Sequence, residues 1–208
     1  HKDYLAHMVK KSGIKVLSGT RVDRGFAQQM KPDVIVVAAG AVPLIPPIPG
    51  INGPNVMGAL DTYYHLEQVG ENVVMIGGGL VGVETALYLA DAGKKVTVIE
   101  MADTAAREAN RLHAEALRIA IRERGVKIRT STQCCAVEDG GILVKGPDGQ
   151  NAKLNADTVV YCVGMRSNSD VYQQLYDCAP EVYRVGDCIR LGTVREALLT
   201  GYYTAAEI

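Results

Sequence analysis

Three glycines in one short segment are the residues of this sequence that most directly suggest chemistry. Residues 77–82 read GGGLVG, a G-x-G-x-x-G pattern that follows an apolar run and precedes an apolar helical pattern. In such a turn the first glycine permits a tight bend, the second lets the backbone approach a diphosphate, and the third lets the helix pack close to the strand. Gly77, Gly79 and Gly82 take these places. The free N–H groups at the helix N-terminus, at Leu80 and Val81, favour an anion.

A carboxylate follows the next predicted strand. Glu100 comes directly after Val96–Ile99 and eighteen residues after Gly82. This is the spacing of the acidic residue that accepts hydrogen bonds from an adenosine ribose in dinucleotide-binding folds. An acidic side chain there favours NAD(H) over NADP(H), because it would repel a 2′-phosphate. The alternative without a ligand is a tight strand–helix turn with a solvated carboxylate at a strand end.

Further candidates lie in the same helix and at other strand ends. Glu84 falls in the first turn of the helix, where a carboxylate suits the dipole. We predict either that capping role alone or a second role in orienting the nicotinamide end of the cofactor. Three more predicted strands stop at a glycine, where an open α/β sheet places its ligand crevice. They add five candidate binding residues: Ala39, Gly40, Gly164, Gly186 and Asp187.

The predicted elements place these residues on alternating strands and helices. Strands are predicted over residues 14–17, 34–39, 73–76, 96–99, 126–129, 158–163 and 182–185, helices over 2–12, 80–92, 108–124 and 194–207, and an antiparallel meander over about 133–154. The helix that begins at Glu108 is predicted from Leu112, Ala116 and Ala120 at i+4 spacing. The predicted fold class is α/β, a Rossmann-like domain with a central parallel sheet and a small antiparallel meander.

Composition narrows the partners. The 208 residues carry 22 Lys and Arg against 23 Asp and Glu, a net charge of -1, so neither a nucleic acid nor an anionic membrane is expected as a partner. The longest apolar runs are too short to span a bilayer. Five cysteines without a C-x-x-C pair and four scattered histidines predict reduced thiols, a cytoplasmic location and no metal site. The first residue is His1 rather than Met, and we expect a fragment of a longer protein.

Residues 32–40, 74–86 and 182–188 resemble the C-terminal half of bacterial NADH:flavin oxidoreductases related to 2,4-dienoyl-CoA reductase, trimethylamine dehydrogenase and the enoate reductases. In that family an NAD(P)-binding domain is inserted in a discontinuous, FAD-binding Rossmann-like domain. The resemblance implies a partial FAD-type domain over 1–45, an NAD(P)-binding domain over 71–155 and the return part of the FAD-type domain over 156–208. Five prolines between Val42 and Pro54 predict a linker, taken as 46–70.

The resemblance also implies roles for individual residues. Asp187 would bind the FAD ribityl chain, Ala39 and Gly40 would mark the crossing between domains, and Gly164 would lie beside the nicotinamide. A complete family member has an earlier G-x-G-x-x-G for the FAD pyrophosphate, a cysteine-ligated iron–sulfur cluster and a barrel that holds FMN and substrate. This sequence contains none of the three, so FMN and the cluster are expected only in a missing N-terminal part, with FAD bound in the intact protein.

The expected function is that of a flavoprotein oxidoreductase fragment, which binds NAD(P)H and passes hydride to a flavin for reduction of an enoate- or enoyl-type substrate in a missing barrel. The cofactors carry the chemistry, so no catalytic side chain is nominated. The lack of a C-x-x-C pair argues against a disulfide exchanger. Two alternatives remain: a non-catalytic module that holds ADP or a dinucleotide structurally, and an α/β scaffold that binds neither. Oligomeric state is not predicted.

Overall fold

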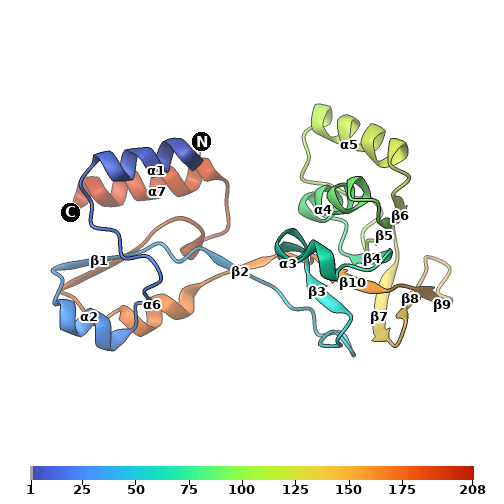
Figure 1. Ribbon diagram of the computed structural model, residues 1–208, viewed down its shortest axis with the longest axis horizontal. Coiled ribbons are helices and arrows are strands. Elements are labelled where there is room, and N and C mark those ends of the chain that lie inside the picture. The colour runs from blue at the N-terminus through green and yellow to red at the C-terminus, as the bar shows by residue number, and fades with distance from the viewer. Residues whose placement is uncertain (1) are drawn as a thin grey trace. The chain divides into compact units, whose positions relative to one another are not determined.

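The computed structural model describes residues 2–208, and these divide into two units (Figure 1). Unit 1 comprises the residues up to Gly40 together with Ser167–Ile208, and unit 2 comprises Ala41–Arg166. Unit 2 is therefore inserted within the sequence of unit 1. The chain passes between them through β2 (Ala41–Pro43) and β11 (Met165–Ser167), which pair with each other.

Unit 2 is built on a parallel sheet of five strands. Their order across the sheet is β3 (Val56–Gly58), β10 (Thr158–Tyr161), β4 (Asn72–Ile76), β5 (Lys95–Ile99) and β6 (Lys127–Arg129). Because the strands are parallel, their carboxyl ends lie at one edge of the sheet, which is where such sheets bind ligands. The residues that follow β4, β5 and β10 are therefore brought together at that edge.

The sheet is buried on both faces, and side chains alternate between two cores. Val73 and Met75 of β4 face the core that contains the helices, whereas Val74 and Ile76 face the core shared with the antiparallel strands. All four are buried. Alternation of this kind requires apolar residues at every position, which explains why β4 reads as a continuous apolar run.

The helical layer of unit 2 contains α3 (Ala59–Tyr64), the 3-10 turn η1 (Leu66–Gln68), α4 (Leu80–Asp91) and α5 (Arg111–Glu123). Gly93 follows α4 with φ 85°, a left-handed conformation that glycine adopts without strain and that commonly ends a helix. Asn110 begins α5, because its side-chain oxygen accepts a hydrogen bond from the His113 N–H at 3.0 Å.

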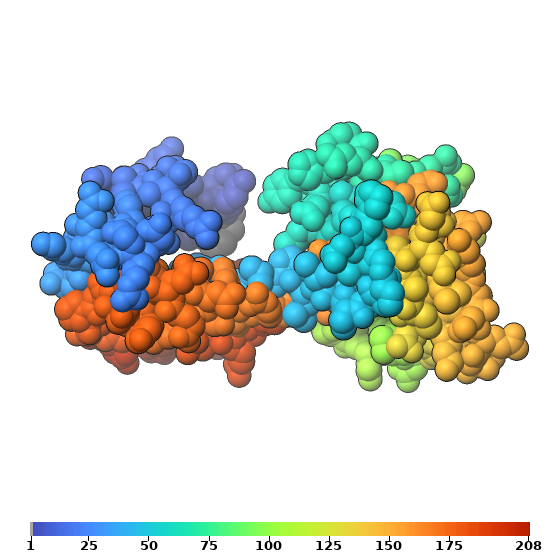
Figure 2. Space-filling model, turned by 90° about the horizontal axis from the view of Figure 1, so that it is seen from below, coloured from blue at the N-terminus to red at the C-terminus, as the bar shows by residue number. Residues whose placement is uncertain are grey.

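The opposite layer is a three-stranded antiparallel sheet, β7 (Gln133–Glu138), β8 (Gly141–Lys145) and β9 (Asn151–Asn155). The proline-rich segment contacts it: the Val137 N–H donates to the Pro49 carbonyl at 2.7 Å. Figure 2 shows the cyan segment around residues 50–58 lying against the yellow segment around residues 133–140. The proline-rich segment is thus fixed against unit 2 by packing and hydrogen bonding.

Unit 1 has a smaller core. Its two parallel strands are β1 (Val34–Val37) and β12 (Glu181–Arg184), and its helices are α1 (Lys2–Lys11), α2 (Arg24–Met30), α6 (Ser169–Leu175) and α7 (Val194–Glu207), with the 3-10 turn η2 (Gly186–Cys188). The buried residues of its core are few, and they are Ala27, Val37, Leu175 and Cys188. Two strands cover little apolar surface, so α1 and α7 each lack a buried residue.

The predicted α/β fold class is confirmed, with a central parallel sheet and a small antiparallel sheet. The expected domain boundaries differ from those of the structure. Residues 46–70 are not a linker alone, because β3 and α3 within them belong to the sheet and core of unit 2. Residues 156–166 belong to unit 2 rather than to the return part of the FAD-type domain, since β10 pairs with both β3 and β4.

Three local predictions were wrong. Residues 14–17 form no strand; Ile14 and Val16 are 63% and 62% exposed, and a strand needs a partner for its backbone groups. The buried face of α5 runs through Leu117 rather than through Leu112, which is 84% exposed. The helix also begins at Arg111 instead of Glu108, because Asn110 caps it.

Candidate dinucleotide site

The fingerprint turn joins β4 to α4 at the carboxyl edge of the sheet. Gly77 has φ 106°, and a Cβ there would lie 2.3 Å from the Cys162 carbonyl oxygen. A Cβ at Gly82 would lie 2.2 Å from the Gly77 carbonyl oxygen. Both contacts are far inside van der Waals distance and involve backbone atoms that cannot move aside. The fold of the turn therefore requires glycine at 77 and 82.

Gly79 differs from its neighbours. It has φ -61° and ψ 176°, an extended conformation open to any residue, and it is the N-cap of α4. The atoms nearest to a Cβ built at Gly79 are the two carboxylate oxygens of Glu108, at 3.7 and 4.0 Å. These belong to a flexible, exposed side chain. Neither backbone conformation nor packing within the protein therefore requires glycine at residue 79, and Asn, Asp or Ser would cap α4 at least as well.

Glu100 lies at the end of β5 with its carboxylate beside the same turn. Its Oε2 accepts a hydrogen bond from the Gly78 N–H at 2.7 Å, and its Oε1 accepts one from the Ala102 N–H at 2.8 Å. These two bonds fix the carboxylate in a half-buried position. An ionised carboxylate offers about four lone-pair sites, so each oxygen retains acceptor capacity for a further donor such as a ribose hydroxyl.

Glu108 is the residue at this site that the sequence did not indicate. Its Oε2 accepts a hydrogen bond from the Leu80 N–H at 3.2 Å, at the first residue of α4. Sequence patterning placed Glu108 inside a helix, but the structure places it in the loop between β5 and α5. The Asn110 cap was the available signal, because an N-cap at 110 leaves Glu108 outside the helix.

Glu84 faces a different neighbour. Its Oε1 lies 3.5 Å from His113 Nε2 on α5, and both side chains are partly exposed. His113 lies in the first turn of α5, but Glu84 lies beyond the first turn of α4, so its predicted first-turn position was wrong. The predicted role of Glu84 at the nicotinamide stays a prediction; within the protein its carboxylate has the His113 imidazole as a neighbour.

The end of β10 completes the edge in unit 2. Cys162 follows the strand beside Gly77, and burial raises the pKa of its thiol. Gly164, two residues further on, has φ 111° and accepts a hydrogen bond from the Leu44 N–H through its carbonyl at 3.0 Å. Gly164 therefore follows β10, the strand that pairs with β4; its predicted place beside the nicotinamide stays a prediction.

The remaining candidates form a second group, within unit 1. The strands β1 and β12 are parallel and pair in register, so their carboxyl ends lie side by side. The residues that follow these ends are Ala39, Gly40, Gly186 and Asp187. The Gly186 N–H donates to Thr200 Oγ1 at 2.8 Å, and Asp187 Oδ1 accepts from the Gly192 N–H at 3.1 Å. The sequence candidates are therefore divided between two groups of residues, one in each unit.

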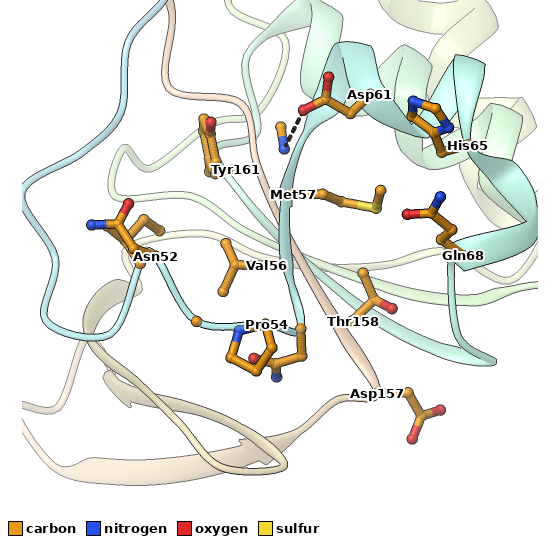
Figure 3. A pocket seen from close by; sticks show the side chains of 14 residues that line it. Asn52, Pro54, Val56, Met57, Asp61, His65, Gln68, Asp157, Thr158 and Tyr161 are labelled. Carbon is orange, nitrogen blue, oxygen red and sulfur yellow. Dashed lines mark hydrogen bonds between the residues drawn. The ribbon is translucent and has the colours of Figure 1, made fainter.

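A pocket of about 730 Å³ lies elsewhere on unit 2, beside β3 and α3 (Figure 3). Asp61, His65, Gln68 and Tyr161 line it, and Figure 3 shows Asp61 bonded to the backbone of Gly58. None of the fingerprint residues lines this pocket, and we place the candidate site at the turn instead.

The outer side of β3 has its N–H groups bonded within the chain. In the parallel register with β10, the N–H groups of Val56 and Gly58 point away from the sheet. They donate to the Gly53 carbonyl and to Asp61, at 3.1 and 3.2 Å.

A parallel sheet with a glycine turn at one strand end and a fixed carboxylate at the next defines a Rossmann-like nucleotide-binding domain. A family model described as "Pyridine nucleotide-disulphide oxidoreductase" matches residues 1–201, and the chain belongs to that family. The family is one of flavoprotein oxidoreductases and implies binding of FAD and NAD(P)H. The five cysteines are free thiols.

Individual relatives agree with this assignment. The chain is 34% identical over 203 residues to a bilirubin reductase of Mediterraneibacter gnavus (strain CC55_001C), covering 97% of this chain and 32% of the relative. It is 29% identical over 212 residues to an NADH oxidase of Thermoanaerobacter brockii, covering 100% and 33%. A solved 2-naphthoyl-CoA reductase, complexed with 2-naphthoyl-CoA, matches with a TM-score of 0.93 and 30% identity, covering 99% of this chain and 31% of that one.

The chain thus spans about a third of the length of these relatives. In the part of the chain that the structure describes, every helix is too short or too polar to cross a membrane.

Proposed function

We propose that unit 2 binds NAD(H), with the diphosphate over Gly79 and the first N–H groups of α4, and with the adenosine ribose on Glu100. The observation that carries this proposal is Gly79, where the fold has room for a side chain and where the N-cap of α4 does not require glycine. A diphosphate that approaches the backbone at residue 79 gives that glycine a reason. The N–H groups of Leu80 and Val81 then supply donors at the positive end of the helix dipole.

The bound dinucleotide supplies a hydride for transfer to a flavin. The part of this chain is to bind and orient: Glu100 holds one end of the cofactor, and the carboxyl ends of β4 and β10, with Gly164, face the other. Precise placement of two reacting rings is itself a large contribution to rate. Gly186 and Asp187 in unit 1 are proposed to contact the flavin, with the rest of the FAD site supplied from elsewhere in a longer protein.

For the whole protein we propose reduction of an unsaturated, enoate- or enoyl-type substrate in a further domain, which would hold FMN and an iron–sulfur cluster. The names of the bilirubin reductase and the 2-naphthoyl-CoA reductase support a reductase of this kind. The test for this part needs the full-length protein, with NADH consumption measured anaerobically against an enoyl-CoA. NADH consumption that does not depend on the enoyl-CoA would contradict it.

The second candidate is a structural module that holds ADP or a dinucleotide without hydride transfer, and the hydrogen bonds of Glu100 suit it equally. Titration of the 208-residue chain with NADH, NADPH and ADP separates the two. We expect NADH to bind more tightly than ADP, because the nicotinamide half adds contacts, and more tightly than NADPH, because Glu100 repels a 2′-phosphate. ADP binding as tightly as NADH favours the structural module, and an absence of binding by all three refutes both.

A further inference from the structure

The carboxylate of Glu108 lies where the proposed function places an anion. It accepts a hydrogen bond from the Leu80 N–H, and its two oxygens are the atoms nearest to the open side of Gly79. We propose that Glu108 sets the affinity of the site for dinucleotides by occupying the diphosphate position in the free protein and leaving it when a diphosphate binds. This inference rests on the proposed function and concerns how that same site is regulated.

The loop that carries Glu108 is fixed to the fingerprint turn by its backbone. The Ala106 N–H donates to the Gly78 carbonyl at 2.7 Å, and the Ala109 N–H donates to the Ala106 carbonyl at 3.0 Å. Ala106 is buried and has φ 50°, a left-handed conformation that costs energy for a residue with a Cβ. The tight turn over residues 106–109 thereby holds Glu108 close to the start of α4.

The side chain can leave without unfolding the loop. Glu108 itself is exposed, whereas the contacts that hold the loop are made by backbone atoms of Gly78, Ala106 and Ala109. Rotation of the Glu108 side chain into solvent therefore frees the Leu80 N–H and leaves the loop in place. Glu100 has no such freedom, because two backbone N–H groups bind its carboxylate and it is only half exposed.

A carboxylate and a diphosphate cannot occupy this position together. Both are anions, both are drawn to the same helix N-terminus, and the Leu80 N–H has a single hydrogen to donate. Each dinucleotide that binds must therefore displace the Glu108 carboxylate from the Leu80 N–H. The cost falls on ligands that carry phosphate and not on those that lack it.

The test compares Glu108→Gln and Glu108→Ala with Asp103→Asn. Asp103 is an exposed carboxylate of the same loop, so its variant removes one negative charge nearby and leaves Leu80 untouched. Binding of ADP, NADH and adenosine to the 208-residue chain is measured by titration calorimetry or NMR. We expect both Glu108 variants to bind ADP and NADH about tenfold more tightly than the parent, a change of about 1.4 kcal/mol. Adenosine affinity should not change, and Asp103→Asn should have little effect.

Equal ADP affinity in the parent and in the Glu108 variants would overturn the inference while leaving the proposed function intact. Weaker ADP binding in those variants would also overturn it, because Glu108 would then be a ligand contact. An equal gain in adenosine affinity would show that the effect is not at the phosphates. Failure of every protein to bind ADP and NADH would overturn the proposed function as well. A crystal structure with ADP should show the Glu108 carboxylate away from the Leu80 nitrogen.

Discussion

Substitution of Gly79 by alanine tests whether this glycine is needed for ligand binding, in contrast to Gly77 and Gly82, which the fold requires. The backbone at residue 79, with φ -61° and ψ 176°, accepts alanine without strain. A Cβ there meets only the Glu108 carboxylate, at 3.7 Å or more. Gly79→Ala weakens the N-cap and so lowers the free energy of unfolding by roughly 0.5–1 kcal/mol. It also reduces the conformational entropy of the unfolded chain, which raises the free energy of unfolding by about 0.4–1 kcal/mol. The free energy of unfolding should therefore change by less than about 1 kcal/mol.

The effect on binding should be much larger. The added methyl group stands on the open side of the turn, where the proposed diphosphate contacts the backbone. Loss of one hydrogen bond to a charged group costs about 1.5–3 kcal/mol, which corresponds to roughly a 10- to 100-fold loss of affinity. NADH titration measures the affinity, and thermal unfolding followed by circular dichroism measures the stability. For a domain of this size the melting temperature should move by at most about 2–4 °C.

Two further variants serve as controls. Gly82→Ala places a Cβ 2.2 Å from the Gly77 carbonyl oxygen, and overpacking of this kind costs about 1–3 kcal/mol of stability. Gly201→Ala in α7 meets nothing within 4 Å and should leave NADH binding unchanged. If Gly79→Ala binds NADH as tightly as the parent, or destabilises the protein as much as Gly82→Ala, then Gly79 is a structural glycine and the reasoning fails.

Two other predictions concern stability. Burial, and secondarily the neighbouring Cys135, raises the pKa of the Cys134 thiol from its ordinary 9.0 to about 11. In the unfolded chain this thiol ionises near pH 9, whereas in the folded protein it stays neutral until about pH 11, so its contribution to stability is full below pH 9 and is lost between pH 9 and 11. At about 1.4 kcal/mol per pKa unit, the loss is about 2–3 kcal/mol. Urea unfolding should show this loss in the parent relative to Cys134→Ala, and parallel pH profiles for the two proteins would contradict it. Asn110→Ala removes the oxygen that accepts from the His113 N–H and should lower the free energy of unfolding by about 0.5–2 kcal/mol; Asn110→Asp, which keeps the oxygen, should not, and equal losses in both would refute the capping role.

The β4–α4–β5 segment could be predicted because every level of sequence pattern agrees there. Continuous apolar runs indicate strands buried on both faces, and the glycines at 77, 82 and 93 stand where backbone geometry or close packing demands them. The spacing from Gly82 to Glu100 follows from the length of one helix and one strand. These patterns are local in the sequence, so the segment could be inferred without knowing that the Cys162 carbonyl, which follows β10, is what requires glycine at 77.

The elements that escaped prediction depend on distant partners. Val56–Gly58 is a strand because β10, about a hundred residues later in the sequence, pairs with it. Residues 14–17 have a strand-like composition but no such partner. The buried face of α5 is set by its packing on α4 and the sheet through Leu117, and i+4 spacing alone allowed another face. Tertiary structure decided each of these cases.

The candidate site was predicted in part for the same reason. Gly77, Gly79, Gly82 and Glu100 follow from sequence spacing, and the structure brings them to one sheet edge. Glu108 required knowledge of the loop after β5, whose path depends on the left-handed Ala106 and its hydrogen bond to Gly78. The Asn110 cap indicates that Glu108 lies outside the helix, but alanine gives no sequence signal for a left-handed conformation, so the position of the carboxylate at the start of α4 could only be found in the structure.

The hydrogen bonds along the outer side of β3 also affect the tendency of this protein to aggregate at high concentration. A strand at the margin of a sheet normally presents free N–H groups that can recruit a strand from another molecule and start aggregation. Here both outward N–H groups, at Val56 and Gly58, are already bonded within the chain. The opposite margin carries Lys127 and Arg129, which are exposed and whose positive charges repel a second copy of the same strand. Both edge strands therefore resist pairing with a strand of another molecule: β3 because its outward N–H groups are already bonded, and β6 because of its positive charge.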